Sequence, residues 1–161
     1  DDLRKASGMK AAKKASRVAA DGIVATKVAA DGNYGVIVEV NSETDFVARD
    51  ESFLGFAQSA VDAAFENKDA DVAAVLAGGL EDAREKLVQK IGENINIRRI
   101  ERLEFADANE GIVESYVHSN NRIAVLISLR GGDSALAKDI AMVRCWLLSL
   151  RSQNKMTAEP I

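Results

Sequence analysis

The feature that most constrains the fold is an internal repeat. Residues 22–40, "GIVATKVAADGNYGVIVEV", lie over residues 111–129, "GIVESYVHSNNRIAVLISL", at a shift of 89 positions and without a gap. In each copy, β-branched and apolar residues flank a short polar turn whose residues tolerate a positive φ angle. The two turns are Asp31-Gly32-Asn33 and Asn120-Asn121. The sequence therefore predicts two β-hairpins of the same design.

A helix is expected after each hairpin, because apolar residues recur there at steps of three and four. In the first copy, the positions that share the apolar face are Phe53, Phe56, Ala57, Ala60, Val61 and Ala64. At the same shift, the second copy has Met142, Cys145, Trp146, Ser149 and Leu150. The pattern favours a β-hairpin–helix unit that is used twice.

The region between the two copies adds further elements. "AAFENKDADVAAVL" ends one helix and begins a short second one. A longer helix is expected over residues 80–91, where Gly92 ends it, and a strand over residues 95–105. The alternation in this strand is only partial, as is typical of a strand beside solvent. Together these elements predict an α+β fold in which antiparallel sheets pack with helices.

We expect three parts along the chain. The segment "GMKAAKKASRVAADG" reads as an Ala/Lys helix that ends at Gly22, so residues 1–21 are expected to form a basic helix. Residues 22–105 then form an N-terminal core subdomain, and residues 106–161 form a C-terminal core subdomain with an atypical tail.

Composition and charge narrow the function. The net charge of −4 disfavours nucleic acid as the main partner, because phosphate binding needs a positive surface. The first twenty residues are locally basic. Their basic side chains form either a solvated face of a helix or a contact with RNA. No apolar run reaches the roughly 18 residues that span a membrane. The single cysteine, Cys145, points to a reducing compartment, so we expect a cytoplasmic protein.

The strand-to-helix corner of the first copy has an unusual composition. In "VEVNSETDFVARDESFLGF", residues Thr44, Asp45, Phe46 and Val47 stand between the second strand and the helix. At the same shift, the second copy has the small and polar residues Asp133-Ser134-Ala135, so the corner itself does not require an aromatic residue. Phe46 is either a core residue that packs onto the helix or an exposed anchor for a partner.

The chain offers no convincing catalytic or metal site. The acids near the corner are Glu39, Glu43, Asp45 and Asp50. We expect ordinary roles for them, with Asp50 as the N-cap of the following helix. The Gly-rich segments lack the spacing of a phosphate-binding loop, and the presence of one histidine and one cysteine argues against a zinc site, which needs several ligands at set spacings. The sequence therefore predicts a recognition protein without a cofactor, and not an enzyme.

Several segments resemble one known family. "GVIVEVNSETDFVARDESFLGFA" closely resembles the signature of bacterial elongation factor Ts, the nucleotide-exchange factor for the translational GTPase EF-Tu. "SGMKAAKKASRVAADGIV", "KLVQKIGENINIRRIERLE", "GIVESYVHSNNRIAVLISLRGGD" and "LAKDIAM" also look like family segments, in the family's order. The resemblance covers about residues 3–142.

The resemblance implies a mechanism. In the family, an Asp-Phe pair enters the GTPase domain of EF-Tu, in its GDP-bound or nucleotide-free form, and disturbs the Mg²⁺ and phosphate site so that GDP leaves. In this chain the pair is Asp45 and Phe46, with Thr44 and Val47 shaping it. Ile91, in "QKIGEN", matches a family position that supports this contact, and His118, in "SYVHS", matches one in the second half that contacts the other domains of EF-Tu.

Some features depart from the family pattern. Family members usually begin with a three-helix domain, whereas this sequence starts in the linker that follows it. The tail "VRCWLLSLRSQNKMTAEPI" carries no family pattern. The resemblance leaves a homodimer through the second half possible. The alternatives to nucleotide exchange are an RNA-binding module that uses the basic first helix and a small hydrolase built on the acidic cluster.

Overall fold

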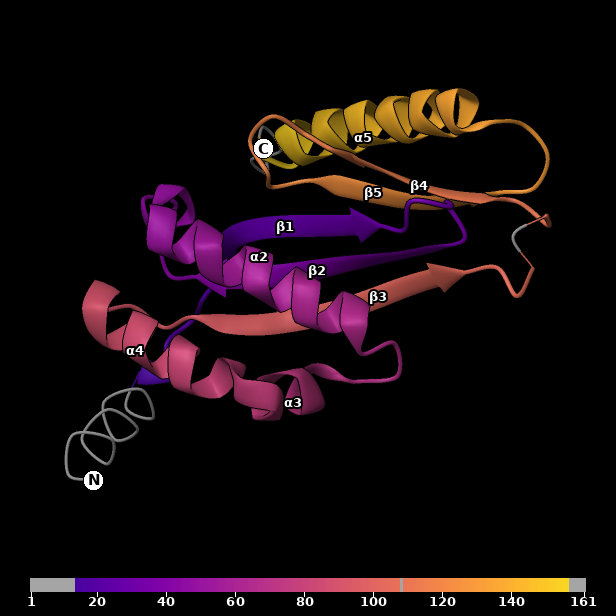
Figure 1. The fold of residues 1–161 in the computed structure, drawn as a ribbon. Coiled ribbons are helices and arrows are strands. Elements are labelled where there is room, and N and C mark those ends of the chain that lie inside the picture. The colour runs from indigo at the N-terminus through magenta and orange to yellow at the C-terminus, as the bar shows by residue number, and fades with distance from the viewer. Residues whose placement is uncertain (1–13, 108, 157–161) are drawn as a thin grey trace. The chain divides into compact units, whose positions relative to one another are not determined.

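The computed structural model describes residues 14–107 and 109–156, and for residues 151–156 it describes the backbone alone. The strands are β1 (Asp21–Val28), β2 (Tyr34–Ser42), β3 (Asn96–Glu104), β4 (Ile112–Val117) and β5 (Ala124–Leu129). The helices are α2 (Glu51–Glu66), α3 (Val72–Val75), α4 (Glu81–Ile91) and α5 (Ser134–Met156), with a 3₁₀ turn at Val47–Arg49 and a π-helical turn at Leu76–Leu80. Figure 1 shows their arrangement.

These elements confirm the predicted α+β fold. β1, β2 and β3 form one sheet in that order, and β4 and β5 form a second, antiparallel sheet. Both hairpin turns fall where the repeat places them, with positive φ angles at Gly32 and Asn121. The strand expected over residues 95–105 is the edge strand β3. No helix within the described ranges is long and apolar enough to cross a membrane.

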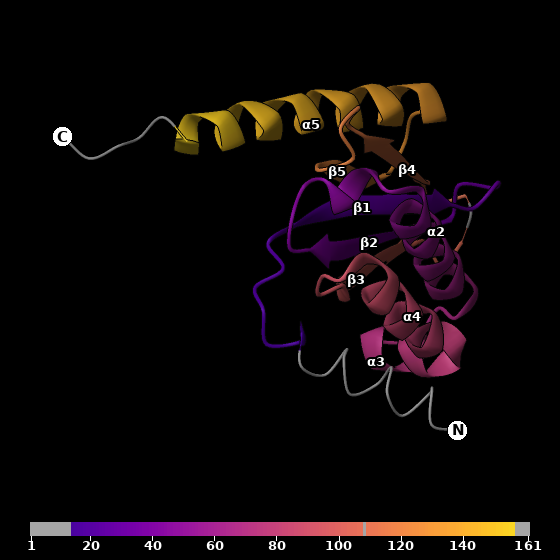
Figure 2. The same ribbon diagram turned by 90° about the vertical axis from the view of Figure 1, so that its left-hand side faces the viewer.

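The chain forms two compact units, and each is described by itself. The first consists of residues up to Ala25 together with Val38–Glu101. Within it, α2 and α4 lie side by side on one face of the sheet (Figures 1 and 2). The inward residues of α2 are the six that the sequence predicts, Phe53, Phe56, Ala57, Ala60, Val61 and Ala64. These six residues are buried, and the strand residues Val38 and Val40 are fully enclosed.

The second unit contains Thr26–Ile37 and Arg102–Ile161. The hairpin β4–β5 approaches the start of β2 closely at Gly35, where a Cβ atom would lie 2.8 Å from Val113 Cγ1. The hydroxyl of Thr26 on β1 donates to that of Ser115 on β4 over 3.0 Å. On the hairpin, α5 packs through small residues, which are Ala137, Ala141, Cys145 and Ser149. Cys145 is fully buried, and burial raises the pKa of its thiol.

The expected inward face of the second helix is partly wrong. Cys145 and Ser149 are buried as predicted, but Met142, Trp146 and Leu150 are exposed, Trp146 by 57%. The two helices also begin at different places. Asp50 is the N-cap of α2, and its equivalent at the shift of 89 would be position 139, whereas Asp133 already accepts from the backbone N–H of Leu136 over 2.9 Å. The inward face of α5 is instead a stripe of small side chains at every fourth position, Ala137, Ala141, Cys145 and Ser149.

Gly22 does not end a helix, as the sequence suggested, because β1 already begins at Asp21. The glycine is needed for another reason. Its φ is 142°, and a Cβ atom there would lie 2.1 Å from the carbonyl oxygen of Val40 on β2. The basic helix expected over residues 1–21 lies mostly outside the described residues. The division of the chain into subdomains at residue 105 stays a prediction.

We expect Gly22→Ala to lower the free energy of unfolding by about 2–3 kcal/mol, because the strained φ and the close approach to Val40 act together. Gly55→Ala is the matched control, since Gly55 lies on exposed α2 surface with nothing within 4 Å of its Cβ position. There alanine should stabilise the helix by about 0.5–1 kcal/mol. Urea unfolding of both variants measures the difference, and equal effects would contradict the strand contact at Gly22.

Candidate functional site: the corner between β2 and α2

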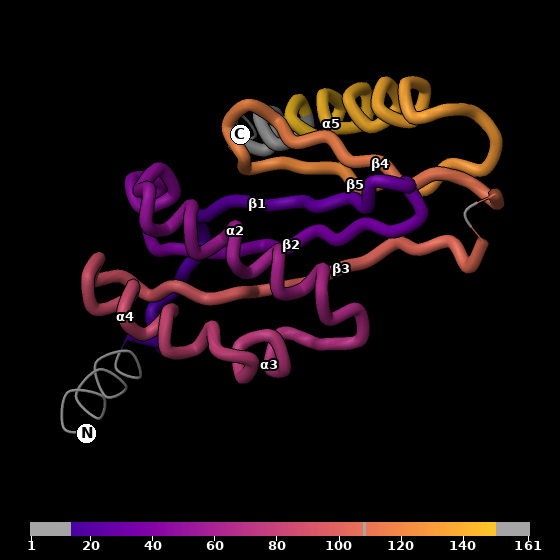
Figure 3. The backbone as a smooth tube through the Cα atoms, viewed as in Figure 1, coloured from indigo at the N-terminus to yellow at the C-terminus, as the bar shows by residue number. Residues whose placement is uncertain are grey.

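The corner places an aromatic side chain in solvent on a short segment that is anchored at both ends. Figure 3 shows the path of the chain from β2 to α2. The chain leaves β2 at Ser42, turns at Asp45 and Phe46, makes one 3₁₀ turn, and enters α2. Phe46 is 80% exposed, whereas its neighbour Val47 is only 8% exposed. Of the two interpretations open from sequence, the structure excludes the core residue. The role of Phe46 as an anchor for a partner stays a prediction.

On its C-terminal side, the corner is fixed by the start of α2. Asp50 is the N-cap, as predicted, and its Oδ1 accepts from the backbone N–H groups of Ser52 over 2.8 Å and Phe53 over 3.2 Å. The hydrogen bond from Phe53, and after it that from Ser52, lowers the pKa of Asp50 because both stabilise the charged carboxylate. Lys90 on the last turn of α4 donates to the Ser52 hydroxyl over 2.6 Å. The first turn of α2 is therefore tied to the end of α4.

On its N-terminal side, the corner is held by Glu93, which follows α4. The Glu93 carboxylate accepts from the Thr44 hydroxyl over 2.7 Å and from the Thr44 backbone N–H over 3.0 Å. Gly92, at φ 91°, ends α4 as predicted and brings Glu93 to this place. Ile91 is the last residue of α4 and is half-buried. The structure thus brings Ile91 into the same unit as the Thr44–Val47 segment, two residues before the glutamate that binds Thr44.

Asp45 is less constrained than its neighbours. Its carboxylate lies 3.9 Å from the Arg49 guanidinium, and both side chains are well exposed. Exposed ion pairs of this kind contribute little to stability because water and salt screen them. The carboxylate of Asp45 therefore stays accessible beside Phe46.

His118 lies in the second unit, directly after β4. Its backbone N–H donates to the Ile123 carbonyl over 2.9 Å, and its Nδ1 lies 3.2 Å from the side-chain oxygen of Asn120. These contacts close the turn of the second hairpin. The contact of His118 with a partner stays a prediction.

The acidic residues around the corner have structural partners. Glu39 on β2 lies 3.0 Å from Arg99 and 3.5 Å from Arg98 on β3. Asp50 caps α2, and the Glu43 carboxylate accepts from the backbone N–H of Asn94 over 2.6 Å. In the part of the chain that the structure describes, no three histidine, cysteine or acidic side chains are grouped so that they could hold a metal ion.

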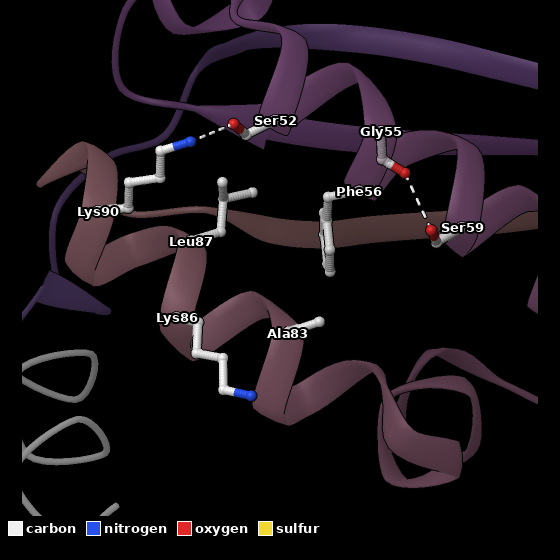
Figure 4. A pocket seen from close by; sticks show the side chains of 8 residues that line it. All are labelled: Ser52, Gly55, Phe56, Ser59, Ala83, Lys86, Leu87 and Lys90. Atoms are coloured by element: carbon white, nitrogen blue, oxygen red, sulfur yellow. Dashed lines mark hydrogen bonds between the residues drawn. The ribbon is translucent and has the colours of Figure 1, made fainter. Parts of the chain in front are cut away.

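A cavity of about 360 Å³ opens between α2 and α4 (Figure 4). Its lining combines an apolar floor with polar edges. The residues are Ser52, Gly55, Phe56, Ser59, Ala83, Lys86, Leu87 and Lys90. The Lys90–Ser52 hydrogen bond closes one end of it, on the side of the first turn of α2.

Sequence reasoning did not identify Glu93, Asn94 or Arg17 as part of the corner. Asn94 is buried, and its side chain donates to the Arg17 carbonyl oxygen over 2.8 Å. The sequence did contain one signal for Glu93. It is a charged residue directly after the glycine that ends a helix, and such a residue can reach a neighbouring loop. The partner of that charge could not be read from the sequence, because Glu43 and Glu93 are far apart along the chain.

We expect Phe46→Ala to change the free energy of unfolding by no more than about 0.5 kcal/mol, because little of the ring is buried. Phe56→Ala is the matched comparison, since Phe56 is 6% exposed and lies on the inward face of α2. Its truncation should cost about 3–5 kcal/mol. Thermal or urea unfolding distinguishes the two, and a large loss in Phe46→Ala would mean that the ring belongs to the core.

The cap at Asp50 predicts a pH effect with a definite sign. Its folded-state pKa is lowered from the ordinary value of 3.8, so its stabilising effect is fully present above that value and is lost as the pH falls through the folded-state pKa. Asp50→Asn keeps an oxygen acceptor for the cap but does not titrate. The stability advantage of the wild type over Asp50→Asn should therefore shrink on acidification below about pH 4. Urea unfolding across this range measures it, and a constant difference would contradict the assignment.

Comparisons with known proteins find one family, and the matched region includes the corner. Residues 43–144 match the family described as Elongation factor TS. The chain is 64% identical to Elongation factor Ts of Hahella chejuensis over 142 residues, which is 88% of this chain and 48% of that protein. It is 63% identical to Elongation factor Ts of Cellvibrio japonicus and 61% identical to that of Saccharophagus degradans, again over 88% of this chain and 47% and 48% of theirs.

The chain spans about half the length of the curated relatives it matches. The match nevertheless covers well over half of this chain and includes the whole corner from Glu43 to the start of α2. The resemblance found in the sequence is confirmed. The chain belongs to the elongation factor Ts family.

Proposed function

We propose that the chain is a guanine nucleotide exchange factor of translation elongation that acts on EF-Tu. The relatives are named as elongation factors, and the part of them that this chain matches contains the corner. The observation that carries the proposal is Phe46. A large aromatic side chain stands 80% exposed at a position where the backbone is fixed on both sides.

An exposed aromatic residue on a fixed corner is suited to binding. Aromatic side chains that enter a partner's pocket supply much of the binding energy of protein interfaces. Because Glu93 and Asp50 already fix the neighbouring backbone, less conformational entropy is lost on binding. Asp45 adds an accessible negative charge directly beside the ring. In our proposal Asp45 and Phe46 enter EF-Tu beside its Mg²⁺ and phosphate site.

Exchange then follows from thermodynamic linkage. A factor that binds nucleotide-free EF-Tu more tightly than the GDP complex must weaken GDP binding by the same ratio. No catalytic group of the factor is needed, so we propose that the chain is not an enzyme and uses no cofactor. Thr44 and Val47 hold the corner, Ile91 supports it, and His118 contacts EF-Tu from the second unit.

Three further points belong to the proposal. We place the protein in the cytoplasm, where translation occurs. A homodimer could form through the exposed apolar side chains of α5, among them Val143, Trp146 and Leu147. RNA binding through the basic first segment is the second candidate. Within that segment, Lys14 donates to the Gly92 carbonyl and Arg17 lies 3.5 Å from Glu43, so these two basic groups already have partners in the chain.

Phe46→Ala should reduce the acceleration of GDP release from EF-Tu by about 30-fold, because truncating a central aromatic anchor costs 2 kcal/mol or more. Val18→Ala is the control, since Val18 is equally exposed, at 83%, and lies outside the corner. The measurement is the release of a fluorescent GDP analogue, with and without each protein.

Each result has a definite meaning. Acceleration by the wild type and by Val18→Ala, but not by Phe46→Ala, supports the proposal. Full activity of Phe46→Ala would refute the role of the corner. No acceleration by the wild type would refute the proposed function for this chain. Tight, strongly salt-dependent binding to a short RNA, unaffected by Phe46→Ala, would favour the second candidate.

A further inference from the structure

Glu93 binds the corner through three hydrogen bonds to two consecutive residues. One oxygen, Oε2, accepts from the backbone N–H groups of Glu43 over 3.1 Å and Thr44 over 3.0 Å. The other oxygen, Oε1, accepts from the Thr44 hydroxyl over 2.7 Å. Hydrogen bonds to a carboxylate are shorter and stronger than those between neutral groups. The backbone of the corner is therefore held by a charged acceptor from another part of the chain.

The arrangement is reciprocal. While Glu93 accepts from the backbone of Glu43, the Glu43 carboxylate accepts from the backbone N–H of Asn94 over 2.6 Å. Each of the two segments, 43–44 and 93–94, thus supplies a carboxylate to the other segment's backbone. The second oxygen of Glu43 lies 3.5 Å from the Arg17 guanidinium, which offsets part of the negative charge. We call these two carboxylates, Glu43 and Glu93, the carboxylate clamp.

The surrounding secondary structure does not need the clamp. α4 is already ended by Gly92, whose N–H donates to the Val88 carbonyl over 2.8 Å. β3 begins only at Asn96, and α2 has its own cap in Asp50. The bonds of Glu93 that the structure describes go to the segment just before Phe46. This placement indicates a role at the corner and not in the helix or the strand.

We propose that Glu93 is a positioning residue for nucleotide exchange. It fixes the backbone at Glu43 and Thr44 and so sets the direction of the Phe46 side chain two residues later, without touching the partner. The proposal rests on the proposed function. Asp50 holds the other end of the same segment, so the carboxylates of Glu93 and Asp50 fix the corner from its two sides.

Without Glu93, the backbone N–H groups of Glu43 and Thr44 would lose their acceptor, while the Glu43 carboxylate would still accept from the N–H of Asn94. Few other contacts hold Thr44 and Asp45. The Ser42 hydroxyl donates to the Thr44 carbonyl over 3.0 Å, and the Asp45–Arg49 pair is loose and exposed. The segment would then adopt several conformations, of which only a fraction presents Phe46 productively. Apparent affinity falls in proportion to that fraction, even when all residues that contact the partner are unchanged.

The first test compares variants of Glu93 in the GDP-release measurement with EF-Tu. Glu93→Ala should lower the exchange efficiency about tenfold, as expected for the loss of hydrogen bonds to a charged group. Glu93→Gln should recover most of the activity, because its amide oxygen still accepts from both N–H groups and its NH₂ can donate to Thr44. Glu66→Ala, which removes an exposed glutamate at the end of α2, should equal the wild type.

A second variant keeps the test decisive if Glu93→Ala does not fold. Glu93→Asp retains the charge but draws the carboxylate back by one methylene, out of reach of the two N–H groups. It should lose activity as Glu93→Ala does. An active Glu93→Asp would mean that the charge, and not the position of the acceptor, matters, and this would overturn the proposal.

A double-mutant cycle distinguishes positioning from direct contact. If Glu93 acts through Phe46, then Glu93→Ala should cause no further loss in a Phe46→Ala background. If Glu93 contacts the partner by itself, the two losses should multiply, and the proposal would be wrong. A purely structural role would lower the unfolding temperature and leave the exchange rate per folded molecule unchanged.

Amide hydrogen exchange tests the clamp without the partner. In Glu93→Ala, the amide protons of Glu43 and Thr44 should exchange at least tenfold faster. The exchange rates of the amide protons of Val38 and Ile97, which lie in the strands, should not change. If the wild type does not accelerate GDP release, the proposed function fails, and hydrogen exchange still decides whether Glu93 holds the corner. If the wild type is active and Glu93→Ala is equally active, only the present inference fails.

Discussion

Burial of one face of α2 against the sheet is the constraint on which the site depends. Phe53 and Val61 are fully enclosed, and they fix where the helix lies and therefore where it must begin. The cap at Asp50 fixes the residue at which α2 begins. The chain therefore has only the segment between Ser42 and Asp50 to connect β2 with α2. Val47 is drawn into the core from this segment, so that Phe46 faces outward. An exposed aromatic residue is thus a result of core packing nearby.

The two copies of the repeat show how such a site can arise on an existing scaffold. Their hairpins keep one register, but the helix of the second copy begins directly after its glycine turn, six positions earlier than in the first. The first copy has extra chain length at the same place, and this length forms the corner. Apart from Val47, which is buried, the addition lies outside the core between a strand and a helix that each have packing of their own. The scaffold and the recognition element are therefore separable in physical terms.

Periodicity and the repeat predicted the hairpins, the inward face of α2, the Gly92 end of α4 and the Asp50 cap, because each depends on residues close together in the chain. The inward face of α5 was partly mispredicted, because α5 packs through small residues at every fourth position while its large apolar side chains are exposed. Gly22 was mistaken for a helix end, since a glycine required by the approach of Val40 looks the same in the sequence. Glu93 and Asn94 were missed because their partners at the corner are distant in the sequence. Sequence could mark Phe46 as unusual but could not decide its exposure.

The position of Cys145 has a practical consequence. It is the single cysteine of the sequence, it is fully enclosed on the inward face of α5, and its Sγ lies 3.8 Å from the Ile123 carbonyl oxygen. A thiol with a raised pKa reacts slowly with alkylating reagents at neutral pH, because the thiolate is the reactive form. A fluorophore or spin label could therefore be attached at a newly introduced surface cysteine while the native residue stays in place. The fold provides a chemically silent background for spectroscopy of the corner.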